Sequence, residues 1–396
     1  MRTAFVNGRV LLPEGFQKDA CVVVAGDRIE AIANAAPEDA NLVDLNGDFL
    51  LPGFIDVQVN GGGGRLFNED PSVETVAIMA DAHRRFGTTG LLPTLISDDL
   101  SVVEKGIAAI EEAIEARVAG ILGIHIEGPF LSRARRGIHL ASMLQPFDDR
   151  FVELLSSAKR GKTVVTLAPE CVAPAQIARL VEAGVIVCTG HSDADYETVK
   201  SAIDAGATGF THLFNGMSQL TNRAPGMVGA ALEDRSTYAG LIVDGHHIHP
   251  ASFRVALNAK GAGRLMLVTD AMASAGSDCS EFTLQGRTIS REGQRLVNDD
   301  GVLAGSTLTM ATAVANAIEQ GHITLETAVQ MASRTPAQFL GHESETGAIA
   351  PGLQADLVIM REDFSICDSW IRGRTADPRH SSKTAESART STPPGG

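Results

Sequence analysis

Residues 163–192 read TVVTLAPECVAPAQIARLVEAGVIVCTGHS. The stretch begins with an apolar run at 163–170 and ends with a second one at 184–192, each of strand length and nearly continuous in hydrophobicity. Runs of this kind are typical of strands that are buried on both faces of a parallel sheet. The residues between them, 173–183, follow the helical period. A strand, a helix and a second strand in this order predict a parallel β-α-β unit.

The same alternation extends along most of the chain. Helical patterns separate most of the apolar runs, for example at 72–86, 100–118 and 193–205. The runs themselves number eight, at 53–59, 88–95, 119–128, 163–170, 184–192, 207–215, 238–247 and 265–272. Eight buried strands alternating with helices predict an α/β fold of the (β/α)8 TIM-barrel type. A doubly wound open sheet has the same periodicity, and the count of eight favours the barrel.

The two ends of the chain have a different pattern. Residues 1–50 contain short β-branched runs broken by Gly, Asn and Asp, and residues 346–374 are similar. We expect these two segments to pair into one small sheet domain that flanks a catalytic barrel formed by 51–345. Residues 277–304 have the pattern of hairpins, which predicts an excursion from the barrel. The polar segment 375–396 is expected to be a disordered tail.

Composition narrows the class of protein. The chain has 396 residues, of which 44% are hydrophobic and 20% charged, as in an ordinary globular enzyme. Its formal net charge of -15 argues against binding to nucleic acid or to an anionic membrane surface. A small anionic substrate would therefore need a local cluster of Arg and His residues. Five cysteines without CxxC spacing, and no apolar run long enough to span a bilayer, lead us to expect a cytoplasmic protein with reduced thiols.

Polar residues end most of the expected barrel strands, where the reactive groups of such barrels lie. They are Asp56, Gln58, Glu127, Glu170, His191, His212, His247 and Asp270. Taken singly, each has a structural explanation, since a His can be a hydrogen-bonded core residue and an Asp can cap a helix. Together, Glu127, His191 and His212 offer one carboxylate and two imidazoles, a set that suits zinc or another borderline divalent ion. The sequence therefore predicts a metal-dependent hydrolase, with Asp270 beside the metal-bound water.

Several motifs resemble those of the amidohydrolase superfamily and, within it, of the N-acetylglucosamine-6-phosphate deacetylases. The motifs are LPGFIDVQVNG (51–61), HIEGPF (125–130), TGHSDA (189–194), THLFNGM (211–217), NRAPGMVG (222–229), VDGHH (243–247), VTDAM (268–272), GVLAGS (301–306) and GLQADLV (352–358). The resemblance implies a (β/α)8 barrel with a small β-sandwich formed from both chain ends. It also implies hydrolysis of the acetamide of N-acetyl-D-glucosamine 6-phosphate to D-glucosamine 6-phosphate and acetate, in amino-sugar catabolism and cell-wall sugar recycling.

The resemblance also implies roles for single residues. Glu127, His191 and His212 match the ligands of the catalytic metal, and Asp270 matches the general base and acid. His139, in the RRGIHL segment at 135–140, resembles the residue that polarises the acetyl carbonyl. The residues that match the holders of the sugar phosphate are Asn215, Gly216, Arg223 and His247. In the family this Arg reaches the site of a neighbouring subunit, which implies a homodimer.

The number of metal ions depends on the first barrel strand. Many members of the superfamily carry a His-x-His pair there, which helps to bind a second metal. We read Asp56-Val57-Gln58 at that place. Since Gln is a poor ligand beside imidazole, we expect one divalent ion per subunit, with Gln58 able to hold a metal-bound water. Zinc is the expected ion, although a Glu-His-His set also accepts Fe, Mn and Co.

Other functions stay open at this stage. An N-acetylgalactosamine-6-phosphate deacetylase would have the same motifs. A cyclic-amide hydrolase would have the His-x-His pair and often a Lys that bridges two metals, and neither is seen at the corresponding strand ends. A non-catalytic barrel that acts as an assembly scaffold would have lost the metal ligands, whereas Glu127, His191, His212 and Asp270 are all present.

Overall fold

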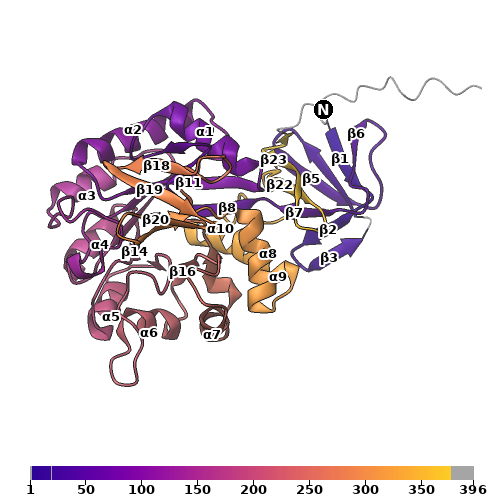
Figure 1. Cartoon of the computed structure of the whole chain (residues 1–396). Coiled ribbons are helices and arrows are strands. Elements are labelled where there is room, and N and C mark those ends of the chain that lie inside the picture. Colours follow the sequence, from indigo (N-terminus) through magenta and orange to yellow (C-terminus); the bar gives the residue numbers. More distant parts are fainter. Residues whose placement is uncertain (1, 19, 376–396) are drawn as a thin grey trace, which may run out of the picture.

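The computed structural model describes residues 2–18 and 20–375. Its centre is an eight-stranded parallel sheet whose strands follow one another in chain order (Figure 1). The first and last strands meet, because the Asp270 N–H donates to the Gln58 carbonyl (3.0 Å) and the Asn60 N–H to the Ala271 carbonyl (2.9 Å). The predicted barrel is confirmed and the open sheet is excluded. The barrel strands are β8 (Phe54–Val59), β11 (Thr88–Ile96), β12 (Gly123–Glu127), β13 (Lys162–Leu167), β14 (Ile186–Thr189), β15 (Gly209–Phe210), β16 (Tyr238–Leu241) and β17 (Leu265–Leu267).

Helices cover the outside of the barrel (Figure 1). In α2, the buried residues Val103, Ile107, Ile110 and Ala113 recur every three or four positions, so that one face packs on the strands. The helices are α1 (Val73–Arg84), α2 (Leu100–Glu115), α3 (Arg150–Leu155), α4 (Pro174–Glu182), α5 (Tyr196–Asp204), α6 (Gly226–Glu233), α7 (Pro250–Lys260), α8 (Met310–Gly321), α9 (Leu325–Ala332) and α10 (Arg334–Leu340). Among the residues that the structure describes, no helix is long and apolar enough to cross a membrane.

The two chain ends form one β-sandwich beside the barrel, as the resemblance implies (Figure 1). One sheet contains β1 (Arg2–Val6), β4 (Cys21–Ala25), β5 (Arg28–Ala33) and β6 (Ala40–Asp44). The other contains β2 (Arg9–Leu12), β3 (Gly15–Lys18), β7 (Phe49–Pro52), β22 (Leu357–Met360), β23 (Ile366–Ile371) and β24 (Arg374–Thr375). The antiparallel pair β7–β22 joins the two ends of the chain, and Phe5 packs edge-on against Trp370 in the core. The expected tail lies, apart from Thr375, outside the described residues.

An antiparallel sheet interrupts the alternation after β17, where the sequence predicts hairpins. It consists of β18 (Glu281–Leu284), β19 (Arg287–Glu292), β20 (Arg295–Asn298) and β21 (Leu303–Ser306). A two-stranded ribbon of β9 (Gly61–Gly62) and β10 (Arg65–Leu66) follows the first barrel strand. Leu66 and Leu284 belong to one apolar cluster, so the two additions pack together.

Asp56 is a structural residue, which corrects its assignment to the end of the first barrel strand. The strand continues to Val59, and Asp56 lies fully buried inside the barrel. Its Oδ2 accepts a hydrogen bond from the Thr269 hydroxyl at 2.6 Å, and its Oδ1 accepts the backbone N–H groups of Thr269 (3.3 Å) and Gln58 (3.2 Å). Burial raises the pKa of this carboxyl to about 7. Asp56 therefore ties the first barrel strand to the segment that follows the last one.

Removal of this carboxyl should destabilise the barrel. In Asp56→Ala the Thr269 hydroxyl and two backbone N–H groups lose their acceptor in a buried place. We expect the free energy of unfolding to fall by at least about 3 kcal/mol, since each of the three unpaired buried donors costs about 1–3 kcal/mol. Urea denaturation followed by circular dichroism measures this loss. An unchanged unfolding midpoint would contradict the closing role of Asp56.

Candidate active site

A cavity of about 260 Å³ lies at the C-terminal ends of the barrel strands. Its polar wall contains Asn60, Glu127, His139, His191, His212, Asn215, His247 and Asp270. Its apolar wall includes Ile96, Ile138, Met272, Leu284, Val302 and Leu303, of which Leu284 and Leu303 belong to strands of the β18–β21 sheet. The cavity therefore offers acid–base groups next to a surface that suits a small apolar group.

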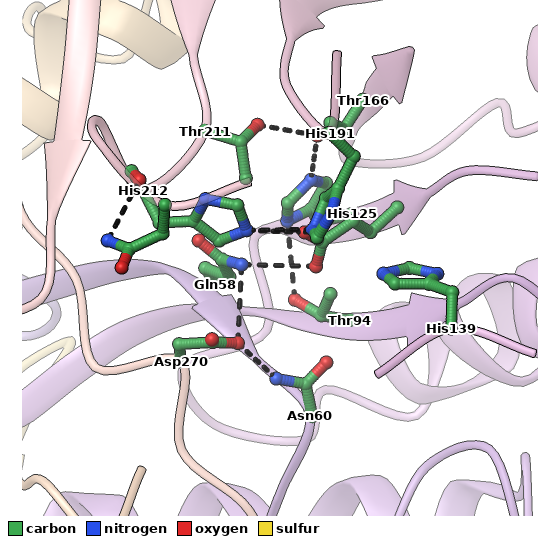
Figure 2. A network of polar contacts seen from close by, with 12 residues as sticks. Gln58, Asn60, Thr94, His125, His139, Thr166, His191, Thr211, His212 and Asp270 are labelled. Carbon is green, nitrogen blue, oxygen red and sulfur yellow. Dashed lines mark hydrogen bonds and ion pairs between the residues drawn. The ribbon is translucent and has the colours of Figure 1, made fainter. Parts of the chain in front are cut away.

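Glu127 meets His191 and His212 at the centre of the polar wall, and the two histidines are labelled in Figure 2. The Glu127 Oε1 lies 3.0 Å from the His191 Nε2 and 2.9 Å from the His212 Nε2, and the two Nε2 atoms lie 3.0 Å apart. All three side chains are buried. Burial opposes the charge of Glu127, but the close contacts of its carboxyl with the two imidazole rings hold the pKa of this group well below its ordinary value. Glu127 is therefore an anion, the form that ligates a metal.

The donor chemistry of this cluster fits a divalent metal ion. The His191 Nδ1 lies 2.8 Å from the Arg135 carbonyl oxygen, which only accepts, so Nδ1 carries the proton. The His191 Nε2 then points its lone pair at a carboxylate oxygen and at a second imidazole. A proton on one ring would relieve one of these contacts, whereas a cation among the three atoms relieves them all. A buried carboxylate and two imidazoles of this arrangement are a ligand set for Zn²⁺ or a similar ion.

His139 lies beside the cluster, on the side away from His212 (Figure 2). One of its ring nitrogens lies within 4.8 Å of ligand atoms of Glu127 and His191. The His139 Nδ1 accepts the backbone N–H of Ser97 at 3.2 Å, and so the proton of the neutral ring is on Nε2. Burial and the neighbouring His191 lower the pKa of His139 well below its ordinary value, which keeps the ring neutral. His139 can therefore donate one hydrogen bond from Nε2.

Asp270 lies on the opposite side of the cavity from His139 (Figure 2). Its Oδ1 accepts hydrogen bonds from the Asn60 Nδ2 at 2.6 Å and the Gln58 Nε2 at 3.2 Å. The same Gln58 nitrogen donates to the Glu127 Oε2 at 3.1 Å. Burial and the charge of Glu127 raise the pKa of Asp270 to about 6. A carboxyl with this pKa can accept and return a proton near neutral pH.

Three of these residues have a left-handed backbone conformation, which directs their side chains into the cavity. His191, His212 and Asp270 have φ values of 47°, 31° and 51°, a region that non-glycine residues rarely adopt. Each lies two or three residues beyond the end of its strand. Conformations of this kind cost energy and occur often at functional sites.

The residues matched to the sugar phosphate fall into two groups. Asn215, Gly216 and His247 line the cavity, and the His247 Nδ1 is held by the Asp244 Oδ2 at 2.7 Å. A Cβ at Gly216 would lie 2.9 Å from the His191 Nδ1, so this close approach requires glycine. Arg223 is exposed on the loop before α6 and is not part of the cavity of its own chain. That loop projects away from the barrel (Figure 1).

Two strand-end expectations are corrected. Glu170 is exposed and accepts hydrogen bonds from the Ser192 hydroxyl (2.6 Å) and the Asp193 N–H (2.7 Å), so it holds the loop after His191. The pair that the first strand presents to the site is Gln58 and Asn60, not Asp56 and Gln58. The reason is the two-residue period of a strand, which places Asp56 one layer deeper.

A buried polar layer that sequence reasoning missed supports the site. The His125 Nε2 lies 2.7 Å from the Thr166 hydroxyl, which lies 2.6 Å from that of Thr211 (Figure 2). Burial lowers the pKa of His125 to about 4 and keeps it neutral. His125 stands two residues before Glu127 on β12, so the strand period could have indicated that both side chains face the barrel interior.

Comparison with known proteins gives consistent matches. The family model described as "Amidohydrolase family" matches residues 49–376. The N-acetylgalactosamine-6-phosphate deacetylase of Shewanella sp. (strain ANA-3) is 47% identical over 93% of this chain and 94% of its own length. The N-acetylglucosamine-6-phosphate deacetylase of Haemophilus influenzae is 33% identical over 94% and 99%. A crystal structure of N-acetylglucosamine-6-phosphate deacetylase from Pasteurella multocida aligns with a TM-score of 0.92 and 35% identity, covering 95% of this chain and 99% of that one.

Proposed function

Since this chain belongs to the amidohydrolase family, we propose that it is a metal-dependent deacetylase of N-acetylated hexosamine 6-phosphates. Its substrate is N-acetyl-D-glucosamine 6-phosphate, and the products are D-glucosamine 6-phosphate and acetate. The observation that carries this proposal is the meeting of Glu127, His191 and His212 with Asp270 in one cavity. The test is acetate release from purified protein supplied with this sugar phosphate.

Glu127, His191 and His212 would hold one divalent ion per subunit, and we propose zinc. When bound, such an ion lowers the pKa of water from about 15.7 to about 7 and polarises a carbonyl group. The proposal of a single ion is supported by Gln58 on the first strand. Its amide nitrogen already donates hydrogen bonds to Glu127 and Asp270, so it is not free to take part in a second metal site. Gln58 can also hold a water molecule at the ion.

His139 and Asp270 would provide the hydrogen bond and the proton transfers of the reaction. His139 would donate its Nε2 proton in a hydrogen bond to the acetyl oxygen, where negative charge develops during attack. Asp270 would accept the proton of the attacking water and return it to the sugar nitrogen, because an amide nitrogen leaves as a neutral amine only after protonation. The apolar wall with Ile138 and Leu284 would receive the acetyl methyl group.

The pH dependence of turnover should report Asp270. Only its carboxylate form can accept a proton, and its raised pKa of about 6 places the change just below neutral pH. We expect kcat to be flat above pH 7 and to fall as pH drops, with an apparent pKa no higher than about 6. A bound cation nearby would move this fall to lower pH, because positive charge favours the carboxylate. A fall of kcat with an apparent pKa well above 6 in folded protein would contradict this role.

The sugar phosphate would be held by Asn215, Gly216 and His247 of one subunit and by Arg223 of its partner in a homodimer. This arrangement is supported by the exposed position of Arg223 outside its own cavity. Arg is suited to the task because its guanidinium can bind two phosphate oxygens at once.

Arg223→Ala should lower kcat/KM for the phosphorylated substrate by about 10- to 100-fold, the value of a charge-assisted hydrogen bond. It should change kcat/KM for unphosphorylated N-acetylglucosamine much less. Lys105→Ala, which removes an exposed charge from α2, is the control. Mixed dimers of Arg223→Ala and Asp270→Asn chains should regain part of the activity, because one of their two sites would be complete. Equal losses on both sugars, or no regain, would contradict the shared phosphate site.

The galactosamine epimer is a second candidate substrate. It is favoured by the relative at 47% identity, whose name gives N-acetylgalactosamine 6-phosphate, while several relatives named for the glucosamine epimer are 33–36% identical. The ratio of kcat/KM for the two epimers, measured in competition, decides between them. We also propose that the enzyme acts in the cytoplasm, which is supported by its free cysteines.

A further inference from the structure

We propose that Asn60 is a positioning residue for Asp270: it fixes one carboxylate oxygen, Oδ1, so that the other oxygen, Oδ2, carries the proton. The inference rests on the proposed function, in which Asp270 is the general base. It assigns a task to the residue that directly follows the first barrel strand and lies outside the proposed ligand and substrate sets.

The hydrogen bonds to the Asp270 carboxylate all reach one of its two oxygens. Its Oδ1 accepts from the amide nitrogens of Asn60 (2.6 Å) and Gln58 (3.2 Å). In the described part of the chain no hydrogen bond reaches its Oδ2. Since an ionised carboxylate only accepts, the nitrogen of the Asn60 amide must face Asp270 and its oxygen must face away. Figure 2 shows this orientation, with the Asn60 oxygen turned toward the His139 side.

The backbone holds Asn60 and Asp270 as one unit. The Asn60 N–H donates to the carbonyl of Ala271, the residue that follows Asp270, at 2.9 Å. The Asn60 carbonyl accepts the N–H of Phe67 at 3.0 Å. Asn60 is only 3% exposed, so its side chain has little freedom to turn. The bond to Asp270 therefore fixes the rotation of a carboxyl group whose own backbone is in the left-handed region, with φ 51°.

The orientation in which the Asn60 amide binds Asp270 is unfavourable for folding. Its Oδ1 is buried without a hydrogen-bond partner among the described residues, which is unfavourable. Asn68 shows what a structural amide looks like in the same loop region, because its oxygen accepts the Ile96 N–H (2.9 Å) and its nitrogen donates to Asp98 (2.9 Å). An amide with only one of its two ends hydrogen-bonded adds little to stability. We therefore expect substitution of Asn60 to change turnover rather than stability.

Two variants test the bond directly. Asn60→Ala should lower kcat by about 10- to 100-fold, the effect of a carboxyl group displaced by about 1 Å, with KM and bound metal unchanged. Asn60→Asp keeps the shape and replaces the donor with an acceptor, so its loss should be at least as large. Gln354→Ala is the matched control, because the Gln354 Nε2 donates to the Glu345 Oε2 at 3.0 Å outside the cavity. It should keep full kcat.

A double-mutant cycle separates positioning from a general structural effect. If Asn60 acts through Asp270, Asn60→Ala should cause no further loss in an Asp270→Ala background. The same loss in both backgrounds would overturn the inference, as would loss of metal or a rise in KM at constant kcat. Failure of the proposed function looks different, because the wild-type protein would then release no acetate from the sugar phosphates, whereas failure of this inference leaves Asp270 essential and Asn60 dispensable.

Discussion

Asp270→Asn should lower kcat by about 10²- to 10⁴-fold, the usual contribution of a general acid–base group. The side chain that replaces it has nearly the same shape, and its amide can neither take the proton of water nor return one to the sugar nitrogen. The hydrogen bond from the Asn60 amide can still reach the remaining carbonyl oxygen. Because Asp270 is not among the three residues that would hold the metal, the variant should still bind metal and substrate.

The measurement pairs turnover with binding. Acetate release gives kcat, calorimetry gives the substrate affinity, and elemental analysis gives the metal content of the same sample. Asp278→Asn, the same change at an exposed acid further along the chain, should have normal turnover. Near-normal turnover of Asp270→Asn would remove Asp270 from the acid–base role.

Glu127→Gln should have the second large effect, through loss of metal. The change removes the only negative charge among the three proposed ligands and turns an amide toward the His191 and His212 nitrogens. Since even the hydrogen-bond partners of metal ligands are worth about 10–100-fold in metal affinity, we expect a loss of at least about 100-fold for a ligand itself. Turnover at limiting metal should fall with it.

Metal titration followed by a competing chelator measures this affinity. Glu182→Gln, on the exposed side of α4, carries the same change in charge away from the site. A high metal concentration should restore part of the activity of Glu127→Gln. Wild-type metal affinity together with wild-type turnover in Glu127→Gln would contradict the proposed ligand set.

The architecture could be predicted because buried parallel strands leave a plain pattern in sequence. Runs such as 163–170 and 184–192 are nearly continuous in hydrophobicity, since helices and the barrel interior cover both faces. Most strand ends followed from the same pattern, and with them the meeting of Glu127, His191, His212 and Asp270 in one cavity.

Whether each polar side chain points into the cavity was harder to predict. Asp56 and Gln58 share one side of β8 and Asn60 follows its last residue, so only the strand's true end decides which of them reach the cavity. Glu170 follows its strand as His191 does, but the left-handed turn at His191 aims that side chain inward, whereas Glu170 is exposed. Such turns carry no sequence signal here, because none of these residues is glycine.

His139 illustrates a different reason. It lies between β12 and α3, where no strand period places its side chain, and only the resemblance pointed to it. In the structure, Ser97 after β11 holds its ring through two contacts at 3.2 and 2.8 Å. Contacts between loops so distant in sequence depend on the completed barrel.

Acetate release from N-acetylated hexosamine 6-phosphates, before and after removal of metal, tests the central claim most directly. The panel contains the glucosamine and galactosamine epimers and unphosphorylated N-acetylglucosamine. We predict that chelated protein releases no acetate, that one equivalent of Zn²⁺ per chain restores release, and that a phosphorylated sugar is the best substrate. Full activity in the chelated protein, or no release from any sugar at any metal content, would contradict the account.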